Sequence, residues 1–548
     1  MPVFAMRAPK FFSRARCPLF GLLLVPTLCL ALSGCFRSEP PADITIINRA
    51  EPDSLDPAII VSQPDMRIAR GMFEGLLRLD PKTARPIPGL AKDWDISPDG
   101  KIYTFHLRTN LVWSTGEPIT ANDVVYSWIR ALKPSTASDY AFALYYLKNG
   151  EAFNAGKITN ASLVGVHALD KYTVRCELNY PIAFFLDLCT FPVMFVVPRQ
   201  TIEKYGDHWI MARPLPSSGP YELAFWRLND RVRLVKNPRY WNAKNTQSAI
   251  IDILPIGSAN TAFNLYESGA ADIVWDKDEI PEELLDTLLK RPDFHKYNFL
   301  GTYFIRFNVT RKPFDDPLVR RALALAIDKE ELVKKIMRAG EQPASHFVPP
   351  GTANYESPQG LGYDPVLAKK LLARAGYPGG KGFPRFEYTF DAAAGGAART
   401  QENIAVELQQ IWADTLGIHM DLRQVETKVF WNMQGTLDYE LSRSSWVGDY
   451  DDANTFLEMF VSNDGENRTG WKNSEYDALI QQANEQRDLK VREEIFQHAE
   501  SILISNQVPI IPLFFYAGVT YYDSNKIQGI YPNVLDDHPL EYIRKLKR

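Results

Sequence analysis

The chain has 548 residues, of which 45% are hydrophobic and 23% charged, so it is a globular protein with more than one core. Aromatic residues make up 12%, a share that fits either large aromatic cores or binding surfaces lined by Tyr and Trp. The formal net charge of -5 argues against a general nucleic-acid binder, which needs a basic face.

The first 34 residues predict a signal peptide. Four basic residues precede the apolar run PLFGLLLVPTLCLALSG, which is short for a membrane span. The run ends in LSGC, at Leu32 to Cys35, which resembles a bacterial lipobox. This resemblance implies that residues 1–34 are removed and that lipids on Cys35 anchor an exported protein, periplasmic or at the cell surface, to a membrane. The alternative is an ordinary cleaved signal with a chance cysteine.

Two further cysteines, Cys176 and Cys189, remain in the exported chain. They could pair in an oxidising compartment. Their surroundings, YTVRCEL and FFLDLCTFP, predict a strand and a buried helix, so two separate buried thiols are at least as compatible with the sequence.

The first half of the chain alternates between predicted strands and helices. A tether at 35–43 precedes a strand and turn at 44–57 and a helix within 58–80. Ile102, Phe105 and Leu107 in KIYTFHLR recur near period two, which predicts a strand. The segment ITANDVVYSWIRAL predicts a helix capped by Thr120 or Asn122.

The same alternation continues in the second half. VRLVKNPRYWN predicts a strand and turn, and AFNLYESGAADIVW a helix followed by a strand. FDDPLVRRALALAIDKEELVKKIMRAG predicts one helix capped by Asp315 or Asp316, ended by Gly340 and broken in its apolar face near Asp328. ARTQENIAVELQQIWADTLGIHMDLRQV runs as a helix through Leu416 into a strand, and QVPIIPLFFYAGVTYY predicts a buried strand. These patterns together predict α/β lobes.

Common catalytic motifs are missing from the sequence. It contains no G-x-x-x-x-G-K-[ST] phosphate loop, no G-x-S-x-G elbow, no H-E-x-x-H zinc helix and no C-x-x-C pair. We therefore expect no enzymatic activity, no cofactor and no metal site, although these motifs leave open a Ser/His/Asp triad assembled in space.

The run WVGDYDD, residues 446–452, places three carboxylates behind a tryptophan. A calcium loop fails because Asn454 takes the place of its glycine and Phe460 that of its bidentate glutamate. A strand containing Trp446 would place Asp449 at its end, where a buried carboxylate needs a cation. The cation could be Arg443 or the ammonium group of a ligand; a solvated acidic turn is the third possibility.

Several segments, in this order, resemble the oligopeptide-binding proteins of bacterial ABC importers, which form extracytoplasmic solute-binding protein family 5. They include EPDSLDP, GMFEGLLRLD, PGLAKDWDISPDGKIYTFHLRTNLVWSTGEPITANDVVYSW, VKNPRYW and SSWVGDYDDANTFLEMF, and the likeness covers nearly the whole mature chain. The resemblance implies an α/β clamshell of two lobes with an additional third domain and a discontinuous first lobe. The expected boundaries are lobe I at 44–73, 199–300 and 515–548, domain II at 74–198 and lobe III at 301–514.

The resemblance also implies a monomeric protein that binds a peptide as an extra strand between its lobes. It would deliver the peptide to a membrane permease driven by separate ATPase subunits. Asp449 matches the residue that pairs with the peptide α-amino group, Trp446 lies beside the strand that pairs with the peptide, and Arg443 matches an arginine placed toward the peptide carboxylate. The other pairing segment matches Val61, Ser62 and Gln63. Asp451 and Asp452 then remain as the polar start of the helix NTFLEMF.

The chain departs from the family pattern where close relatives hold the peptide carboxylate. Basic family residues are replaced by Met337, Gln401 and either Asn432 or Met433, and cysteines that some members pair are replaced by Gly301 and Val447. The amine grip is thus expected to be retained and the carboxylate grip altered. Alternatives are the same scaffold with a murein peptide, metal chelate, haem or opine-like cargo, or a lipid-anchored peptide sensor without transport.

Overall fold

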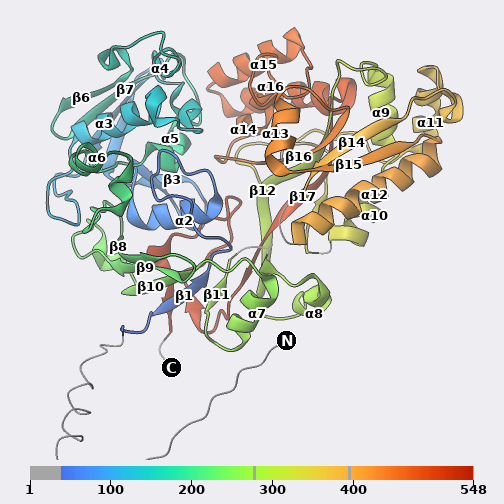
Figure 1. Cartoon of the computed structure of the whole chain (residues 1–548). Coiled ribbons are helices and arrows are strands. Elements are labelled where there is room, and N and C mark those ends of the chain that lie inside the picture. Colours follow the sequence, from blue (N-terminus) through green and yellow to red (C-terminus); the bar gives the residue numbers. More distant parts are fainter. Residues whose placement is uncertain (1–38, 276–278, 338, 393–395, 547–548) are drawn as a thin grey trace, which may run out of the picture. The chain divides into compact units, whose positions relative to one another are not determined.

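The largest element in the computed structural model is a mixed sheet, shown in Figure 1. The structure describes residues 39–275, 279–337, 339–392 and 396–546. Within these ranges the sheet has eleven strands, in the order β15-β14-β16-β12-β17-β11-β1-β10-β9-β8, with β13 paired to β17. Its strands are β1 (Ile44–Ile47), β8 (Tyr221–Arg227), β9 (Arg231–Lys236), β10 (Ile250–Leu254), β11 (Ile273–Val274), β12 (Phe294–Phe307), β13 (Gln342–Pro343), β14 (Phe386–Asp391), β15 (Met420–Val425), β16 (Leu441–Val447) and β17 (Ile510–Tyr521).

Strands β12 and β17 run antiparallel along the middle of this sheet (Figure 1). Their pairing is regular from Phe294 to Asn298 and resumes at Thr302, with a register shift between. Such an irregularity bends and twists a strand pair locally. Because the sheet is continuous through β12 and β17, these two strands connect the β1-β10-β9-β8 side of the sheet to the β16-β14-β15 side.

A separate antiparallel sheet is built from residues 91–177, in the order β4-β5-β7-β6. It consists of β4 (Ala91–Ile96), β5 (Ile102–Leu107), β6 (Val166–Asp170) and β7 (Thr173–Glu177). Tyr103 and Phe105 of β5 pack with Trp128 and other residues in an apolar cluster drawn almost entirely from residues 58–196. Two short pairs complete the strands, β2 (Leu77–Leu79) with β3 (Pro86–Pro88) and β18 (Ile527–Gln528) with β19 (Arg544–Lys545).

Helices cover both faces of the sheet around β12. Tyr303, Ile305 and Phe307 pack with residues of α9, α11 and α12, whereas Leu300 and Phe304 pack with residues of α14, α15 and α16. The helices are α2 (Gln63–Met72), α3 (Ala121–Leu132), α4 (Gly150–Asn154), α5 (Phe185–Leu188), α6 (Arg199–Tyr205), α7 (Ala259–Glu267), α8 (Leu285–Leu288), α9 (Pro317–Leu325), α10 (Lys329–Leu332), α11 (Pro365–Arg374), α12 (Gly396–Leu416), α13 (Thr427–Gly435), α14 (Asn454–Leu457), α15 (Ser474–Glu485) and α16 (Leu489–Ser501).

Two helices begin at the capping residues predicted from the sequence. Asp123 accepts a hydrogen bond from the Thr120 N–H at 2.8 Å where α3 begins, and Asp316 caps α9 by accepting from the Leu318 N–H at 2.8 Å. The single helix predicted for 314–340 is wrong, because Asp328 caps a new helix, α10, by accepting from the Glu331 N–H at 3.0 Å. This second cap divides the segment at the point where its apolar face is interrupted.

The helix predicted within 58–80 is also shorter than expected. Ser62 caps α2, Pro64 stands in its first turn, and the helix ends at Met72. The apolar residues that follow form β2, which pairs with β3 as a hairpin. A short apolar run such as FEGLLRL is compatible with either a helix or a strand, and here pairing with β3 makes part of it a strand.

Both cysteines of the described chain are buried free thiols, Cys176 in β7 and Cys189 at the end of α5. Cys35 and the predicted signal peptide lie outside the described residues. Within the part of the chain that is described, no helix is both long enough and apolar enough to cross a membrane.

Candidate functional site

A cavity of about 1150 Å³ lies between segments that are far apart in the sequence. This volume exceeds the roughly 300–1,000 Å³ of a typical small-molecule site. The irregular part of β12 and β17 forms one wall through Phe299, Tyr516 and Gly518. Other parts of the wall include the start of α2, the segment around Tyr140, residues from 335 to 341, the N-terminal half of α12, the end of β16 and residues 535–537.

Strand β16 presents an unpaired edge next to this cavity. On one side its residues Leu441–Val447 pair with β12, but on the other side β14 pairs only with Leu441 and Ser442. Among the described strands, none pairs with residues 443–447 on that second side. Arg443, Ser445 and Val447 line the cavity. An open edge beside a cavity can accept main-chain hydrogen bonds from an added strand.

The segment Val61–Gln63 lies in another part of the cavity wall. The Val61 side chain is 48% exposed, and Ser62 accepts a hydrogen bond from the Asp65 N–H at 3.3 Å as the cap of α2. The helix start fixes the backbone of this segment, while its side chains remain accessible to a ligand. The sequence prediction that the segment contacts the ligand remains a prediction.

Trp446 is the one predicted site residue of the described chain that does not line the cavity. Alternation along β16 turns its ring to the opposite face of the sheet, where it packs against the cluster that contains Leu300 and Phe304. Its Nε1–H donates to the Thr455 hydroxyl at 3.4 Å. The indole therefore supports the strand from behind and makes no part of the cavity wall.

Asp449 stands at the end of β16, after a glycine that the packing requires. A Cβ on Gly448 would come within 2.5 Å of a Leu300 side-chain carbon, so the chain turns where only glycine fits without a shift. The Asp449 carboxylate lines the cavity, and its backbone N–H donates to the Thr455 hydroxyl at 3.3 Å. No cation of the described chain lies within ion-pairing distance of this carboxylate.

The electrostatic surroundings of Asp449 favour its neutral form. Burial raises the pKa of its carboxyl to about 7, a hydrogen bond with Tyr140 opposes this rise, and the nearby charge of Glu466 adds to it. An ionised carboxylate is unfavourable in such a buried position unless a cation pairs with it, so a cation that enters the cavity would stabilise the ionised form. The position is thus suited to an ammonium group supplied by a ligand.

Arg443 does not pair with Asp449, so the internal ion pair considered from the sequence is wrong. Its guanidinium pairs with Asp391, with Nη2–Oδ1 and Nε–Oδ1 distances of 2.6 and 2.7 Å. The same group lies 5.2 Å from the ring centre of Phe430 and 5.8 Å from that of Trp431. Nearby acidic groups outweigh desolvation and raise the pKa of Arg443. A ligand carboxylate would have to share this cation with Asp391.

The other two acids of WVGDYDD are held by distant parts of the chain. Asp451 accepts a hydrogen bond from the Ala353 N–H at 2.8 Å. Asp452 forms a two-bond ion pair with Arg492, at 2.6 and 2.8 Å, and also accepts from the Asn454 N–H at 2.9 Å. The predicted helix-start role therefore applies in part to Asp452 and not to Asp451.

Of the positions where this chain lacks a basic residue of the family, some line the cavity and others do not. Met337 and Gln401 line the cavity, and Gln401 accepts a hydrogen bond from the Tyr303 hydroxyl at 2.7 Å. Asn432 and Met433, in α13, are not among the lining residues. The cavity therefore has an uncharged amide and a thioether at two of these places.

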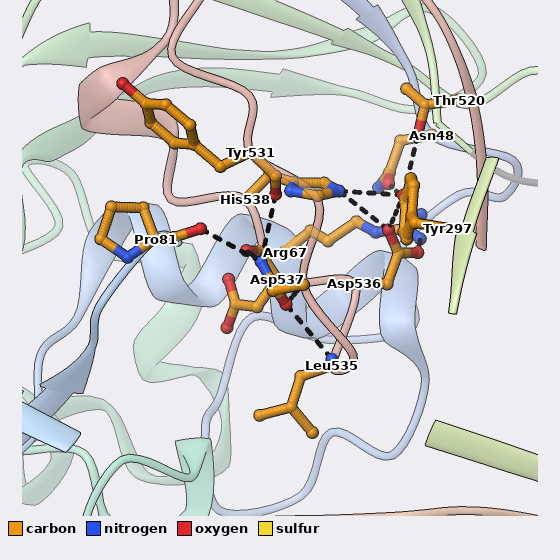
Figure 2. A network of polar contacts seen from close by, with 11 residues as sticks. Asn48, Arg67, Pro81, Tyr297, Thr520, Tyr531, Leu535, Asp536, Asp537 and His538 are labelled. Atoms are coloured by element: carbon orange, nitrogen blue, oxygen red, sulfur yellow. Dashed lines mark hydrogen bonds and ion pairs between the residues drawn. The ribbon is translucent and has the colours of Figure 1, made fainter. Parts of the chain in front are cut away.

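A polar network at the base of α2, shown in Figure 2, was not predicted from the sequence. Arg67 donates to the Asn48 side chain at 3.2 Å and pairs with Asp536 at 3.4 Å. Asp536 accepts from the Tyr297 hydroxyl, and its Oδ1 lies 2.9 Å from Nε2 of the buried His538. Because Tyr297 belongs to β12, the network connects α2, which begins at Gln63, to a strand of the central pair.

Tyr140 is a second residue that sequence reasoning missed. It stands in SDYAFALYYL among other tyrosines, where no local signal separates it from a core residue. In the fold its ring lies 4.8 Å from that of Phe191, and its hydroxyl forms a hydrogen bond with the Asp449 carboxyl. Only the tertiary contact identifies it.

The sequence matches the family model of the bacterial extracellular solute-binding proteins, family 5, over residues 85–468. The chain belongs to this family. It is 34% identical over 508 residues to the periplasmic oligopeptide-binding protein OppA of Salmonella typhimurium, which covers 89% of this chain and 91% of the relative. The resemblance to solute-binding proteins predicted from the sequence is confirmed.

Solved structures agree with the fold. An oligopeptide-binding protein of an ABC transporter from Borrelia burgdorferi superimposes with a TM-score of 0.80 at 34% identity, covering 92% of this chain and 100% of that one. Haemophilus influenzae OppA in complex with the peptide RPPGFSPFR gives 0.77 at 27% identity, covering 93% and 100%. The predicted α/β periplasmic-binding-protein fold with a third domain is confirmed, whereas the domain boundaries stay a prediction.

Membership in a solute-binding family also confirms the prediction that the chain is not an enzyme. Among the described residues, no group of three or more His, Cys, Asp and Glu side chains is placed to hold a metal ion. The site is a binding cavity with one half-buried carboxylate at the end of an open strand edge.

Proposed function

We propose that this protein is the peptide-binding component of an ABC importer and that it delivers peptides to a membrane permease driven by separate ATPase subunits. The observation that carries the proposal is the open edge of β16 beside the cavity, with Asp449 at its end. Main-chain pairing with that edge would hold a peptide of any sequence, and the carboxylate would hold its first residue. Family membership supports the transport role.

In this proposal the peptide lies as an added strand with its α-ammonium group against Asp449. Val61, Ser62 and Gln63 contact the peptide from the other wall, and Arg443 lies toward its carboxylate end. Because Arg443 is already paired with Asp391, it attracts a carboxylate less strongly than an unpaired arginine would. The amine end is therefore expected to contribute more affinity than the carboxylate end.

Calorimetry with tri-alanine and its N-acetyl derivative at pH 7 tests this function. The acetyl group removes the positive charge and adds little bulk, so we expect it to weaken binding by about one to three powers of ten. A carboxy-amidated peptide serves as the matched control and should lose less affinity. Equal binding of the acetylated and free peptides would refute the amine site, and no binding of any of the peptides would argue for another cargo.

We further propose that lipids on Cys35 anchor the mature protein to a membrane. The lipobox-like LSGC supports this proposal, since attachment of more than one acyl chain gives stable anchoring. Growth with a labelled fatty acid should label the wild-type protein and keep it in the membrane fraction. An unlabelled protein released without detergent would refute the anchor.

A further inference from the structure

Tyr450 follows Asp449 directly and is buried in an unexpected place. Its side chain is 6% exposed and belongs to the apolar cluster whose other buried members all lie between residues 58 and 196. One aromatic residue of the 441–460 region is thus embedded in the core of the segment that carries the four-stranded sheet. Tyr450 does not line the cavity.

The receiving surface for Tyr450 is aromatic. Its ring stacks on Phe184, with ring centres 4.7 Å apart and an interplanar angle of 8°. Tyr146 packs edge-on against the same Phe184 ring at 5.2 Å. Aromatic pairs of this kind contribute free energy beyond the area that they bury.

Hydrogen bonds also link the two segments that this ring stack joins. Asn454 donates to the Tyr450 hydroxyl at 3.1 Å and also to the Glu458 carboxylate. Glu458 in turn accepts from the Tyr146 hydroxyl at 2.6 Å. The ring stack and these bonds form a closed circuit between the segment after β16 and residues 146–184.

This circuit fixes Tyr450, the residue next to Asp449, through contacts that lie outside the cavity. The Asp449 side chain is short, so the position of its carboxylate depends closely on the position of its backbone. Displacement of Tyr450 would move that backbone. We propose that Tyr450 is a positioning residue for the amine end of the peptide: its docking against Phe184 holds Asp449 in the cavity wall. The proposal rests on the proposed role of Asp449.

Electrostatics provide a signature of this role. The groups that face the Asp449 carboxyl are Tyr140 and Glu466, and burial is the main cause of its raised pKa. Release of Tyr450 would expose the carboxyl to water, so its pKa would fall toward the ordinary range near 4. The pH at which peptide affinity is half lost would then fall as well, an effect that simple destabilisation of the fold does not produce.

Phe184 and Phe185 offer a matched pair of variants. Both side chains are 1% exposed in the same cluster, but the ring contacts of Phe185 are with Tyr103, Phe105 and Trp128, all within its own segment. Phe184→Leu removes the stack with Tyr450, whereas Phe185→Leu removes a ring of equal size without touching Tyr450. Leucine retains most of the volume, which favours folding of both variants.

The test is calorimetric binding of tri-alanine between pH 5 and 7.5, with thermal melting of each empty variant as the measure of folding. Phe184→Leu and Tyr450→Leu should weaken binding at pH 7 by about three- to tenfold. Their midpoint of affinity against pH should fall by about one unit. Phe185→Leu should bind as the wild type does.

Wild-type affinity and an unchanged midpoint in folded Phe184→Leu would overturn the proposal. Equal losses in Phe184→Leu and Phe185→Leu would also overturn it, because a general packing effect would then explain both. Asp449→Asn separates this failure from failure of the proposed function. If Asp449→Asn binds as the wild type does, the amine site itself is wrong, whatever the phenylalanine variants show.

Discussion

Replacing Asp449 with asparagine removes one negative charge from the cavity and leaves the size of the side chain almost unchanged. In the wild type, burial raises the pKa of this carboxyl to about 7. Only the ionised form can pair with a peptide ammonium group, so the apparent affinity scales with the ionised fraction. That fraction falls from about one half at pH 7 to about 0.03 at pH 5.5.

The sign of the pH effect follows from this titration. The peptide amine, with a pKa near 8, remains mostly protonated over this interval, so only the site titrates. We expect the dissociation constant of the wild type to rise about 15-fold as the pH falls from 7 to 5.5. Peptide binding at pH 7 should release close to half a proton, because pairing with the ammonium group drives the carboxyl to full ionisation.

Asp449→Asn should abolish both effects and weaken binding at pH 7 by about one to three powers of ten. Isothermal titration calorimetry at several pH values, in buffers with different ionisation enthalpies, measures the affinity and the proton release together. A wild-type dissociation constant that is the same at pH 5.5 and 7 would refute the reasoning. Tight binding by Asp449→Asn at pH 7 would refute it too.

Four further outcomes are expected. The folded-state pKa of Asp449 lies above its unfolded value of 3.8, so the empty wild type loses stability as the pH rises from about 4 to 7. Empty Asp449→Asn should therefore melt at a higher temperature than the wild type at pH 8, with a gain in free energy of unfolding of at most about 4 kcal/mol. This difference should vanish near pH 4. Asp391→Asn leaves the buried guanidinium of Arg443 without its counter-ion, so it should cost roughly 3–5 kcal/mol of stability; an unchanged melting temperature would contradict the assigned pair. Trp446→Phe should lower the melting temperature but change peptide affinity by less than about twofold in calorimetry, since the indole lies behind the strand. Cys35→Ser should appear unlabelled in the soluble fraction after growth with a labelled fatty acid, and continued membrane retention would argue against the anchor.

Local patterns were sufficient to predict several of the helices and strands. Thr120, Asp316 and the alternation in KIYTFHLR are signals that act over a few residues, and the structure contains the elements that they predict. The order of strands in the large sheet was not predictable in this way. It depends on pairings such as β1 with β10 and β12 with β17, which join segments separated by a large part of the chain.

In the site, too, some features follow from the local sequence and others depend on long-range contacts. The position of Asp449 at the end of a strand follows from the run WVGDYDD, whereas its lack of a cation and the pairing of Arg443 with Asp391 do not. Asp391 lies 52 residues before Arg443, and nothing near either residue marks the other as its partner. Tyr450 stands between acids in the sequence, where it suggests an exposed turn, and only the aromatic surface around Phe184 explains its burial.

The charge pairs in the cavity wall have a consequence for the orientation of a bound chain. Four basic side chains that line the cavity already have a carboxylate partner: Arg67 with Asp536, Arg70 with Asp537, Lys335 with Glu407 and Arg443 with Asp391. Asp449, in contrast, has no cation partner in the described chain. A peptide inserted in reverse would bring its own carboxylate against Asp449, where two like charges repel in a poorly solvated space. If Asp449 binds the peptide amine as proposed, we expect the cavity to select one orientation of a bound peptide whatever its sequence.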